Sequence, residues 1–149
     1  MARCRFVRPN TITLPLSEGD WILVKERLNA GEQRKLVEAS RFDTPDADGL
    51  YQIDPTRAGL ALILAYLIDW SFTGFDGAPM AIKGLTAEEL QRTVDNLEPP
   101  DYSEIRNAIN AHTASLFAAR EAEKKRMAGE NGSSTISTSP GVVTGAMSG

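Results

Sequence analysis

Residues 54–70 read DPTRAGLALILAYLIDW and contain an uncharged and strongly apolar run, 58–68. Asp54 followed by Pro55 is a strong helix start, because aspartate accepts hydrogen bonds from the free N–H groups of the first turn and proline is preset for the first helical position. Large apolar side chains then fall on every side of the predicted helix, so neighbouring elements must cover it on several sides. The run is shorter than the ~20 residues of a membrane-spanning helix. The sequence therefore predicts a buried central helix from Pro55 to about Trp70.

A β-hairpin is predicted ahead of this helix. Residues 11–16 alternate polar and apolar side chains with a period of two, and the turn-forming segment 17–20 separates them from the apolar run 21–24. Pro15 cannot donate a backbone hydrogen bond, which favours a position at the sheet edge for the first strand. A helix over 21–28 is the alternative interpretation of the second arm.

A surface helix is predicted between the hairpin and the central helix. In a capping box, the cap side chain and an acid three residues later bond each other's backbone N–H groups. Asn29 and Glu32 have this spacing, and few apolar residues follow, so we expect a surface helix over 30–40. Proline, glycine and several acids then favour a loop over 41–53.

Beyond the central helix the sequence predicts a chain reversal and another capped helix. The dipeptide Asp76-Gly77, within 71–79, is typical of a tight turn. Thr86 and Glu89 form a second capping box, and an apolar stripe follows them. We expect this helix to stop at the proline pair at 99–100, because the residue before a proline disfavours helical geometry.

The last predicted helix leads into a tail. Asp101 and Glu104 again have the cap spacing. Apolar residues then recur at steps of three and four. This stripe consists of Tyr102, Ile105, Ile109, His112 and Leu116. From residue 129 onward the chain is rich in Gly, Ser and Thr, a composition that buries too little apolar area to offset the entropy of ordering. We therefore expect a mainly α fold: a small helical domain over 1–128 with a short N-terminal β-hairpin, and a disordered tail over 129–149.

The overall charge argues against nucleic acid as a partner. The formal net charge is −4, and phosphate binding needs clustered Lys and Arg. The basic start with Arg3, Arg5 and Arg8 is the one exception, and we interpret it as solvated charge. Cys4 is the single cysteine, which suits a reducing compartment, and no apolar run follows the basic start, so no secretory signal is predicted.

No residue pattern predicts catalysis, a cofactor or a metal. A zinc site needs about four Cys or His ligands, and the chain has one of each, Cys4 and His112, which also make a poor nucleophile and base pair. Asp46, Asp48 and Gly49 resemble part of a calcium loop. The position of the bidentate glutamate, however, is occupied by Pro55. We therefore expect a protein that is not an enzyme.

Large aromatic residues outside the helical stripes are the remaining candidates for a functional site. They are Trp21, Trp70, Phe72 and Phe75. Aromatic side chains dominate core burial, so completing the core is the first interpretation. The second is that Trp70, Phe72 and Phe75 anchor a partner, because they lie where the central helix ends and the chain turns.

The order of features from residue 58 onward resembles that of the tail assembly chaperones of long-tailed bacteriophages. The N-terminal half, with an extended segment at 12–15 and the helix start Gly31-Glu32, is also similar to this family. The resemblance rests on the apolar helix ending in Asp69-Trp70-Ser71-Phe72-Thr73, on Asp76-Gly77 and Pro79, on Leu85-Thr86-Ala87-Glu88-Glu89-Leu90, and on Ile105, Ala108, Ile109 and His112.

The resemblance implies a helical protein of the host bacterial cytoplasm that keeps the phage tape measure protein soluble while the tail tube assembles, and that is absent from the finished virion. It implies contact with the tape measure protein, with the tail tube protein and with further copies of the chain. It implies no catalytic residues, cofactor, nucleic acid or membrane. In this family a longer form often arises by ribosomal frameshifting. The alternatives are a structural virion component, such as a minor tail or head–tail connector protein, and an enzyme.

Overall fold

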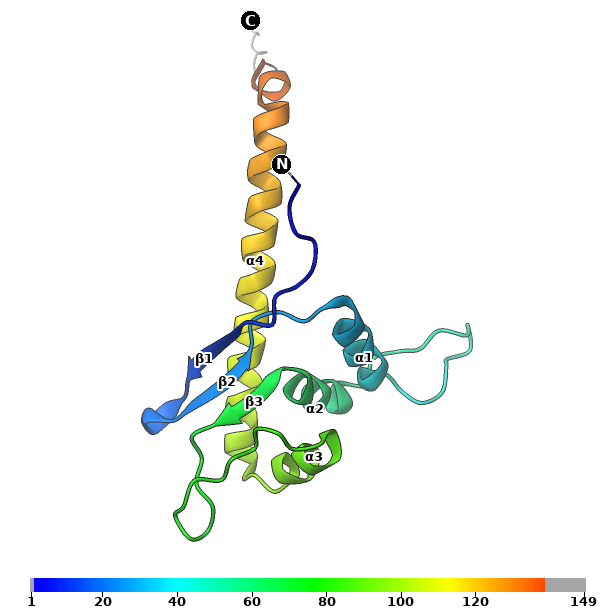
Figure 1. Ribbon diagram of the computed structural model, residues 1–149. Helices are drawn as coiled ribbons and strands as arrows, with labels where there is room; N and C mark the ends of the chain where they lie inside the picture. The colour runs from blue at the N-terminus through cyan, green and yellow to red at the C-terminus, as the bar shows by residue number, and fades with distance from the viewer. Residues whose placement is uncertain (1, 139–149) are drawn as a thin grey trace, which may run out of the picture. The chain divides into compact units, whose positions relative to one another are not determined.

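The computed structural model describes residues 2–138, and their side chains as far as residue 128. The chain divides into two compact units, with the boundary after Asn110. The first unit contains a three-stranded antiparallel sheet, three helices and the first turns of a fourth (Figure 1). The helical domain with an N-terminal hairpin that the sequence predicts is thus present, with one strand more than expected.

The hairpin prediction is confirmed. Strands β1 (Thr11–Pro15) and β2 (Trp21–Lys25) pair antiparallel, joined by the short 3-10 turn η1 (Ser17–Gly19). The sheet order is β1-β2-β3, so β1 lies at an edge, as Pro15 requires. The alternative helix over 21–28 is wrong, because residues 21–25 form the central strand of the sheet.

The predicted length of the central helix is wrong. Helix α2 (Pro55–Tyr66) begins with the predicted Asp54 cap, but the chain then straightens into strand β3 (Leu67–Trp70). This strand pairs with β2, with Trp70 opposite Ile22. A short apolar run of this kind can form a strand as well as a helix. The open edge of β2 offers hydrogen-bond partners to the backbone of residues 67–70, and this pairing makes them a strand.

Both capping boxes are confirmed, and they start helices α1 (Ala30–Ser40) and α3 (Ala87–Asp95). The Glu32 N–H donates to Asn29 Oδ1 at 2.8 Å, and Asn29 N–H donates back to Glu32 Oε1 at 2.9 Å. The same pair of bonds joins Thr86 and Glu89 at 3.2 and 3.0 Å. A hydrogen bond from the Lys25 ammonium and one from the Asn29 N–H hold the pKa of Glu32 below its usual range.

The start of the last helix differs from the prediction. Helix α4 (Pro99–Thr138) begins at the two prolines instead of after them, and the N–H groups of Asp101 and Tyr102 donate to the Glu98 carbonyl, both at 3.0 Å. Proline is preset for the first helical turn, so the pair starts this helix. Glu104 therefore does not cap Asp101; its carboxylate accepts from Ser17 N–H at 2.6 Å and from Ser17 Oγ at 3.0 Å.

The end of α4 also differs from the prediction. The helical backbone continues to Thr138, so residues 129–138 are not without regular structure. No proline lies between 100 and 140 to remove a backbone donor and break the helix. The rest of the predicted disordered tail, 139–149, lies outside the described residues. Within 2–138, no helix is both long enough and apolar enough to cross a membrane.

One hydrophobic core organises the first unit. Strands β2 and β3 face helices α2, α3 and the start of α4 through it. Its buried members are Ile22, Val24, Leu28, Ile63, Tyr66, Leu67, Trp70, Ile82, Val94, Ile105 and Ile109. None of the α2 residues from 58 to 66 is exposed, which agrees with a helix covered on several sides. Within this helix Ile63 is fully buried, whereas the neighbouring Leu64 is only half-buried.

The second unit consists, among the described residues, of the rest of α4. His112 is buried, as its place in an apolar stripe predicts, while Phe117 and Met127 are exposed. Two ion pairs with a spacing of three residues, Glu121 with Lys124 and Glu123 with Arg126, stabilise the solvated helix surface. Pairs of this kind contribute a few tenths of a kcal/mol each, about 0.2–0.5.

Candidate partner-binding surface

The three aromatic residues predicted to anchor a partner have different surroundings. Trp70 is a core residue, 5% exposed, and its indole N–H donates to the Met80 carbonyl at 2.6 Å. Phe72 stacks on it with ring centroids 4.8 Å apart and is half-buried against the core. Trp70 therefore completes the core, which was the first of the two interpretations, because the strand β3 turns it inward opposite Ile22.

Phe75, in contrast, is fully exposed at the tip of the segment 71–82. The segment reverses as Asp76-Gly77 predicts: Gly74 N–H donates to the Ala78 carbonyl at 2.8 Å, and Ala78 N–H donates to Asp76 Oδ1 at 3.0 Å. Gly77 adopts φ of 78°, a conformation that favours glycine.

The same segment is fixed to the core at both ends. Trp70 precedes it, and Ile82, which is 2% exposed, closes it. Between them the Met80 N–H donates to the Phe72 carbonyl at 3.0 Å. We call residues 71–82 the Phe75 loop. Its tip therefore presents one large aromatic side chain on a backbone whose shape is set by packing.

A second group of exposed apolar residues lies on α1 and in the loop that connects α1 to α2, and it was not predicted. It consists of Val37, Phe42, Leu50, Tyr51 and Ile53. The connecting loop extends beyond the ends of both helices (Figure 1). Its proline, glycine and acids predicted a loop correctly, and the signal that was overlooked is the number of large apolar residues within it. Scattered exposed apolar residues are ordinary, but several on one loop indicate a contact surface.

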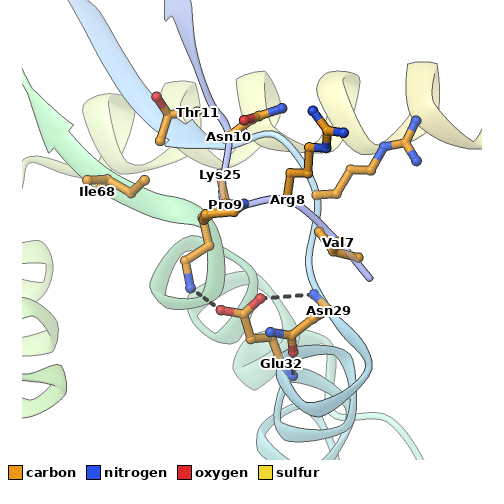
Figure 2. Close-up of a pocket in the computed structure, with 10 residues that line it drawn as sticks. Val7, Arg8, Pro9, Asn10, Thr11, Lys25, Asn29, Glu32 and Ile68 are labelled. Carbon is orange, nitrogen blue, oxygen red and sulfur yellow. Dashed lines mark hydrogen bonds and ion pairs between the residues drawn. The ribbon is translucent and has the colours of Figure 1, made fainter. Parts of the chain in front are cut away.

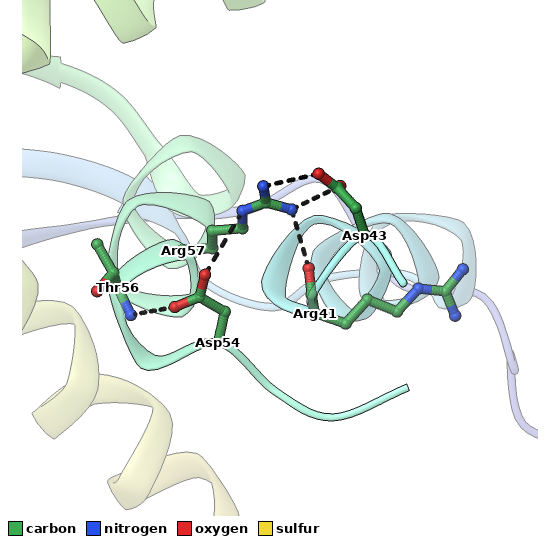
Figure 3. A network of polar contacts seen from close by, with 5 residues as sticks. All are labelled: Arg41, Asp43, Asp54, Thr56 and Arg57. Atoms are coloured by element: carbon green, nitrogen blue, oxygen red, sulfur yellow. Dashed lines mark hydrogen bonds and ion pairs between the residues drawn. The ribbon is translucent and has the colours of Figure 1, made fainter. Parts of the chain in front are cut away.

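Polar contacts hold the base of this loop (Figure 3). Arg57 of α2 donates to both carboxylate oxygens of Asp43, at 2.7 and 3.0 Å, and to the Arg41 carbonyl at 3.2 Å. Hydrogen bonding to the Arg57 guanidinium holds the pKa of the Asp43 carboxyl below its usual range. The Asp54 N–H donates to the Ser40 carbonyl at 2.8 Å and joins the ends of the two helices.

The partial calcium-loop pattern has a structural use inside the same loop. One oxygen of Asp46 accepts from the N–H groups of Asp48 and Leu50, each at 2.9 Å, and the other accepts from Gln52 Nε2 at 2.7 Å. These bonds, with that from Gln52 first, lower the pKa of Asp46. Over residues 2–138, no group of three or more His, Cys, Asp or Glu side chains is placed to hold a metal ion.

A surface pocket of about 170 Å³ opens beside the start of α1 (Figure 2). The N-terminal segment supplies Val7, Arg8 and Pro9 to its lining, and Arg27 and Ile68 line it as well. Lys25 is paired there with Glu32, which also completes the capping box. Cys4, which comes before these residues in the sequence, is exposed.

Comparison of the chain with protein-family models, with curated proteins and with solved structures finds no match.

Proposed function

We propose that this chain is a phage tail assembly chaperone, which binds the tape measure protein in the host cytoplasm and keeps it soluble while the tail tube assembles. The proposal is supported by the resemblance of its sequence to that family. The structural observation that carries it is the exposed Phe75 at the tip of a loop fixed to the core.

An exposed aromatic residue on a rigid loop suits the capture of a client. Binding energy is concentrated in a few large anchors, and aromatic residues are the most frequent among them. The loop is closed by Trp70 and Ile82, both buried, so little conformational entropy remains to be lost on binding. Phe75 can therefore enter an apolar site on a long client helix at small ordering cost.

A second exposed apolar side chain in the Phe75 loop extends the area available to the client. Met80, in the same loop, is partly exposed, and its terminal methyl lies over Gly74, 3.2 Å from where a Cβ at that position would be. Together Phe75 and Met80 give an aromatic and a flexible side chain, a combination that adapts to apolar surfaces of different shape.

Co-expression with a fragment of the tape measure protein tests the proposal. Wild-type chain should raise the soluble fraction of the fragment and co-purify with it. Phe75→Ala should lower both several-fold at unchanged helical content, since a central anchor costs ~2 kcal/mol or more. Phe6→Ala is the matched control, because Phe6 is equally aromatic and exposed but lies in the N-terminal segment.

Two results would contradict the proposal. If the wild-type chain neither binds nor solubilises the tape measure fragment, the chain is not its chaperone. If the chain is instead present in purified phage particles at a fixed copy number, a structural tail or connector protein becomes the better interpretation. A client captured equally well by wild type and Phe75→Ala would place the binding surface outside the Phe75 loop.

A further inference from the structure

Strand β1 has backbone groups that face away from the sheet. The Glu26 N–H donates to the Asn10 carbonyl at 2.9 Å, so by the alternation of an antiparallel pair the even-numbered residues of β1 bond to β2. The N–H and C=O groups of Thr11 and Thr13 therefore point to the other side. Within the described residues no strand of the sheet lies on that side, and both threonines are exposed. These groups are thus open to an extended chain.

The part of this edge from residue 11 to residue 14 lacks the usual protection against strand addition. Proteins commonly block an edge with charged side chains, a bulge or a proline. Residues 11–14 are Thr, Ile, Thr and Leu, and they pair with β2 in unbroken register. Pro15 lacks an N–H and blocks only the far end of the strand. The edge can therefore accept a short strand that starts before Pro15.

Positive charge lies at the start of the same strand. The pocket of Figure 2, which we call the basic pocket, is lined by Thr11 and by Arg8 and Arg27. Neither guanidinium has a hydrogen bond or ion pair among the described residues, whereas the Lys25 ammonium, also in the lining, is paired with Glu32. Two cationic side chains without a carboxylate partner thus stand at the N-terminal end of β1.

This charge selects the direction of an added strand. Antiparallel pairs are slightly more stable per residue than parallel ones. A segment antiparallel to β1 has its C-terminal end beside Thr11, and its last residues then lie next to Arg8 and Arg27. Guanidinium–carboxylate hydrogen bonds are charge-assisted and are among the strongest that side chains make. Acidic residues at the C-terminal end of the segment therefore match the basic pocket.

The two faces of the sheet select the other side chains of the segment. Ile12 lies opposite Val24, a core residue, yet is 37% exposed because nothing within the described residues pairs beyond β1. Apolar side chains of an added strand would cover Ile12 on this face. On the opposite face they would lie beside Thr11 and Thr13, where hydroxyl side chains fit. Successive strand residues point to opposite faces, so the segment should alternate apolar and hydroxyl residues.

We propose that β1 accepts an added strand from another protein: an extended segment, antiparallel to β1, that alternates apolar and hydroxyl residues and ends in acidic residues bound to Arg8 and Arg27. Backbone bonds to Thr11 and Thr13 supply affinity, and the acidic end supplies direction and specificity. This second recognition surface lies outside the Phe75 loop. It goes beyond the proposed chaperone function and does not depend on it.

Fluorescence anisotropy with two labelled peptides and the full chain tests the proposal. The peptide VTVTLED has the required pattern, and DELTVTV has the same composition with its acids at the other end. Both carry the label at the N-terminus and an amide at the C-terminus, so only the order of side chains differs. VTVTLED should bind about tenfold or more tightly than DELTVTV, and its affinity should fall as salt rises because the charges are at the surface.

Two pairs of variants separate the backbone edge from the charge. Thr13→Pro removes an edge donor without removing a bond to β2, so it should weaken VTVTLED binding about tenfold or more at unchanged circular dichroism, while Thr13→Val keeps the N–H and should bind like wild type. Arg8→Glu with Arg27→Glu should weaken binding to a similar extent. Lys83→Glu with Arg92→Glu makes the same change in net charge outside β1 and the basic pocket, and should have little effect.

Several results would overturn the proposal. They are a wild type that binds neither peptide, equal binding of the two peptides, and full binding of VTVTLED by the variant with both pocket arginines reversed. A wild type that forms dimers which Thr13→Pro dissociates would also overturn it, since a second copy would then occupy the edge.

Capture of the tape measure fragment is measured separately, and Phe75→Ala should bind VTVTLED like wild type. The two proposals can therefore fail independently. Peptide binding without client capture would keep the strand addition and reject the chaperone function, and client capture without peptide binding would do the reverse.

Discussion

The Phe75 loop and the loop between α1 and α2, residues 42–53, which we call the acidic loop, both reverse the chain around an aspartate and a glycine with positive φ. Both expose large apolar side chains, yet they are held differently. The Phe75 loop is fixed by Trp70 and Ile82 in the core. The acidic loop buries none of its apolar residues and is fixed by the carboxylates of Asp43 and Asp46.

The difference shows that a loop's shape can depend on packing or on charge, with different consequences. Packing couples the Phe75 loop to global stability, because its end residues belong to the core. Polar contacts at the surface are weak and sensitive to salt and pH, so the acidic loop can open while the core stays folded.

Trp70→Ala should have the largest effect. It removes a buried indole, its stacking on Phe72 and its hydrogen bond to the Met80 carbonyl, so the free energy of unfolding should fall by roughly 3–5 kcal/mol. Leu50→Ala in the acidic loop should change it by less than about 0.5 kcal/mol. Urea denaturation of both variants checks the ranking, and equal midpoints would show that the two loops are anchored alike.

Alanine at the two turn glycines should have an intermediate effect. Gly77 and Gly49 have φ of 78° and 80°, and no atom lies within 4 Å of where an added Cβ would be at either position. Backbone strain alone then costs about 1–2 kcal/mol at each turn. In Gly77→Ala this cost should lower the thermal midpoint, because the loop is fixed to the core. In Gly49→Ala the acidic loop should open instead, with little change in the midpoint.

Arg57→Met should have the smallest global effect and the clearest local one. The Phe42 N–H donates to the Gln52 carbonyl at 3.0 Å across the base of the loop. The substitution removes both bonds to Asp43, so the protection of this N–H against hydrogen exchange should fall several-fold at neutral pH. The Met80 N–H, in the Phe75 loop, is the matched control and should keep its wild-type protection. An equal loss of protection in both loops would show that they are held in the same way.

The protection of the Phe42 N–H against hydrogen exchange should decrease as the pH is lowered. Asp43 and Asp46 have pKa values lowered in the folded state, so their stabilisation is present above the ordinary aspartate pKa of about 4 and is lost as pH falls through the lowered values. Wild-type protection at Phe42 should therefore decrease on acidification after correction for intrinsic exchange. Arg57→Met should retain only the part of that decrease contributed by Asp46.

Local side-chain chemistry explains which predictions from the sequence are confirmed. The caps at Asn29, Asp54 and Thr86 bond to N–H groups two or three residues away, and the turn at Gly77 depends on one residue's φ. Interactions over such short separations are visible in the sequence itself. The edge position of β1 follows in the same way from the missing donor of Pro15.

Which of the apolar residues are buried could be assigned only from the fold. Leu64, in the middle of the apolar run 58–68, is half-buried, while Ile63 is fully buried, because an apolar helix does not reveal which side its neighbours cover. We accordingly expect Ile63→Ala to be more damaging than Leu64→Ala. The exposed group around Leu50 was missed for a similar reason: residue type does not report exposure.

The sequence by itself determined the starts of α1, α2 and α3, the hairpin and the tight turns, since each depends on neighbours within a few residues. Tertiary structure decided the rest. It made residues 67–70 a strand because β2 offered an open edge, and it placed Glu104 on Ser17, 87 residues away in sequence. It also placed Trp70 in the core and Phe75 in solvent, because burial depends on what packs against a side chain from distant parts of the chain.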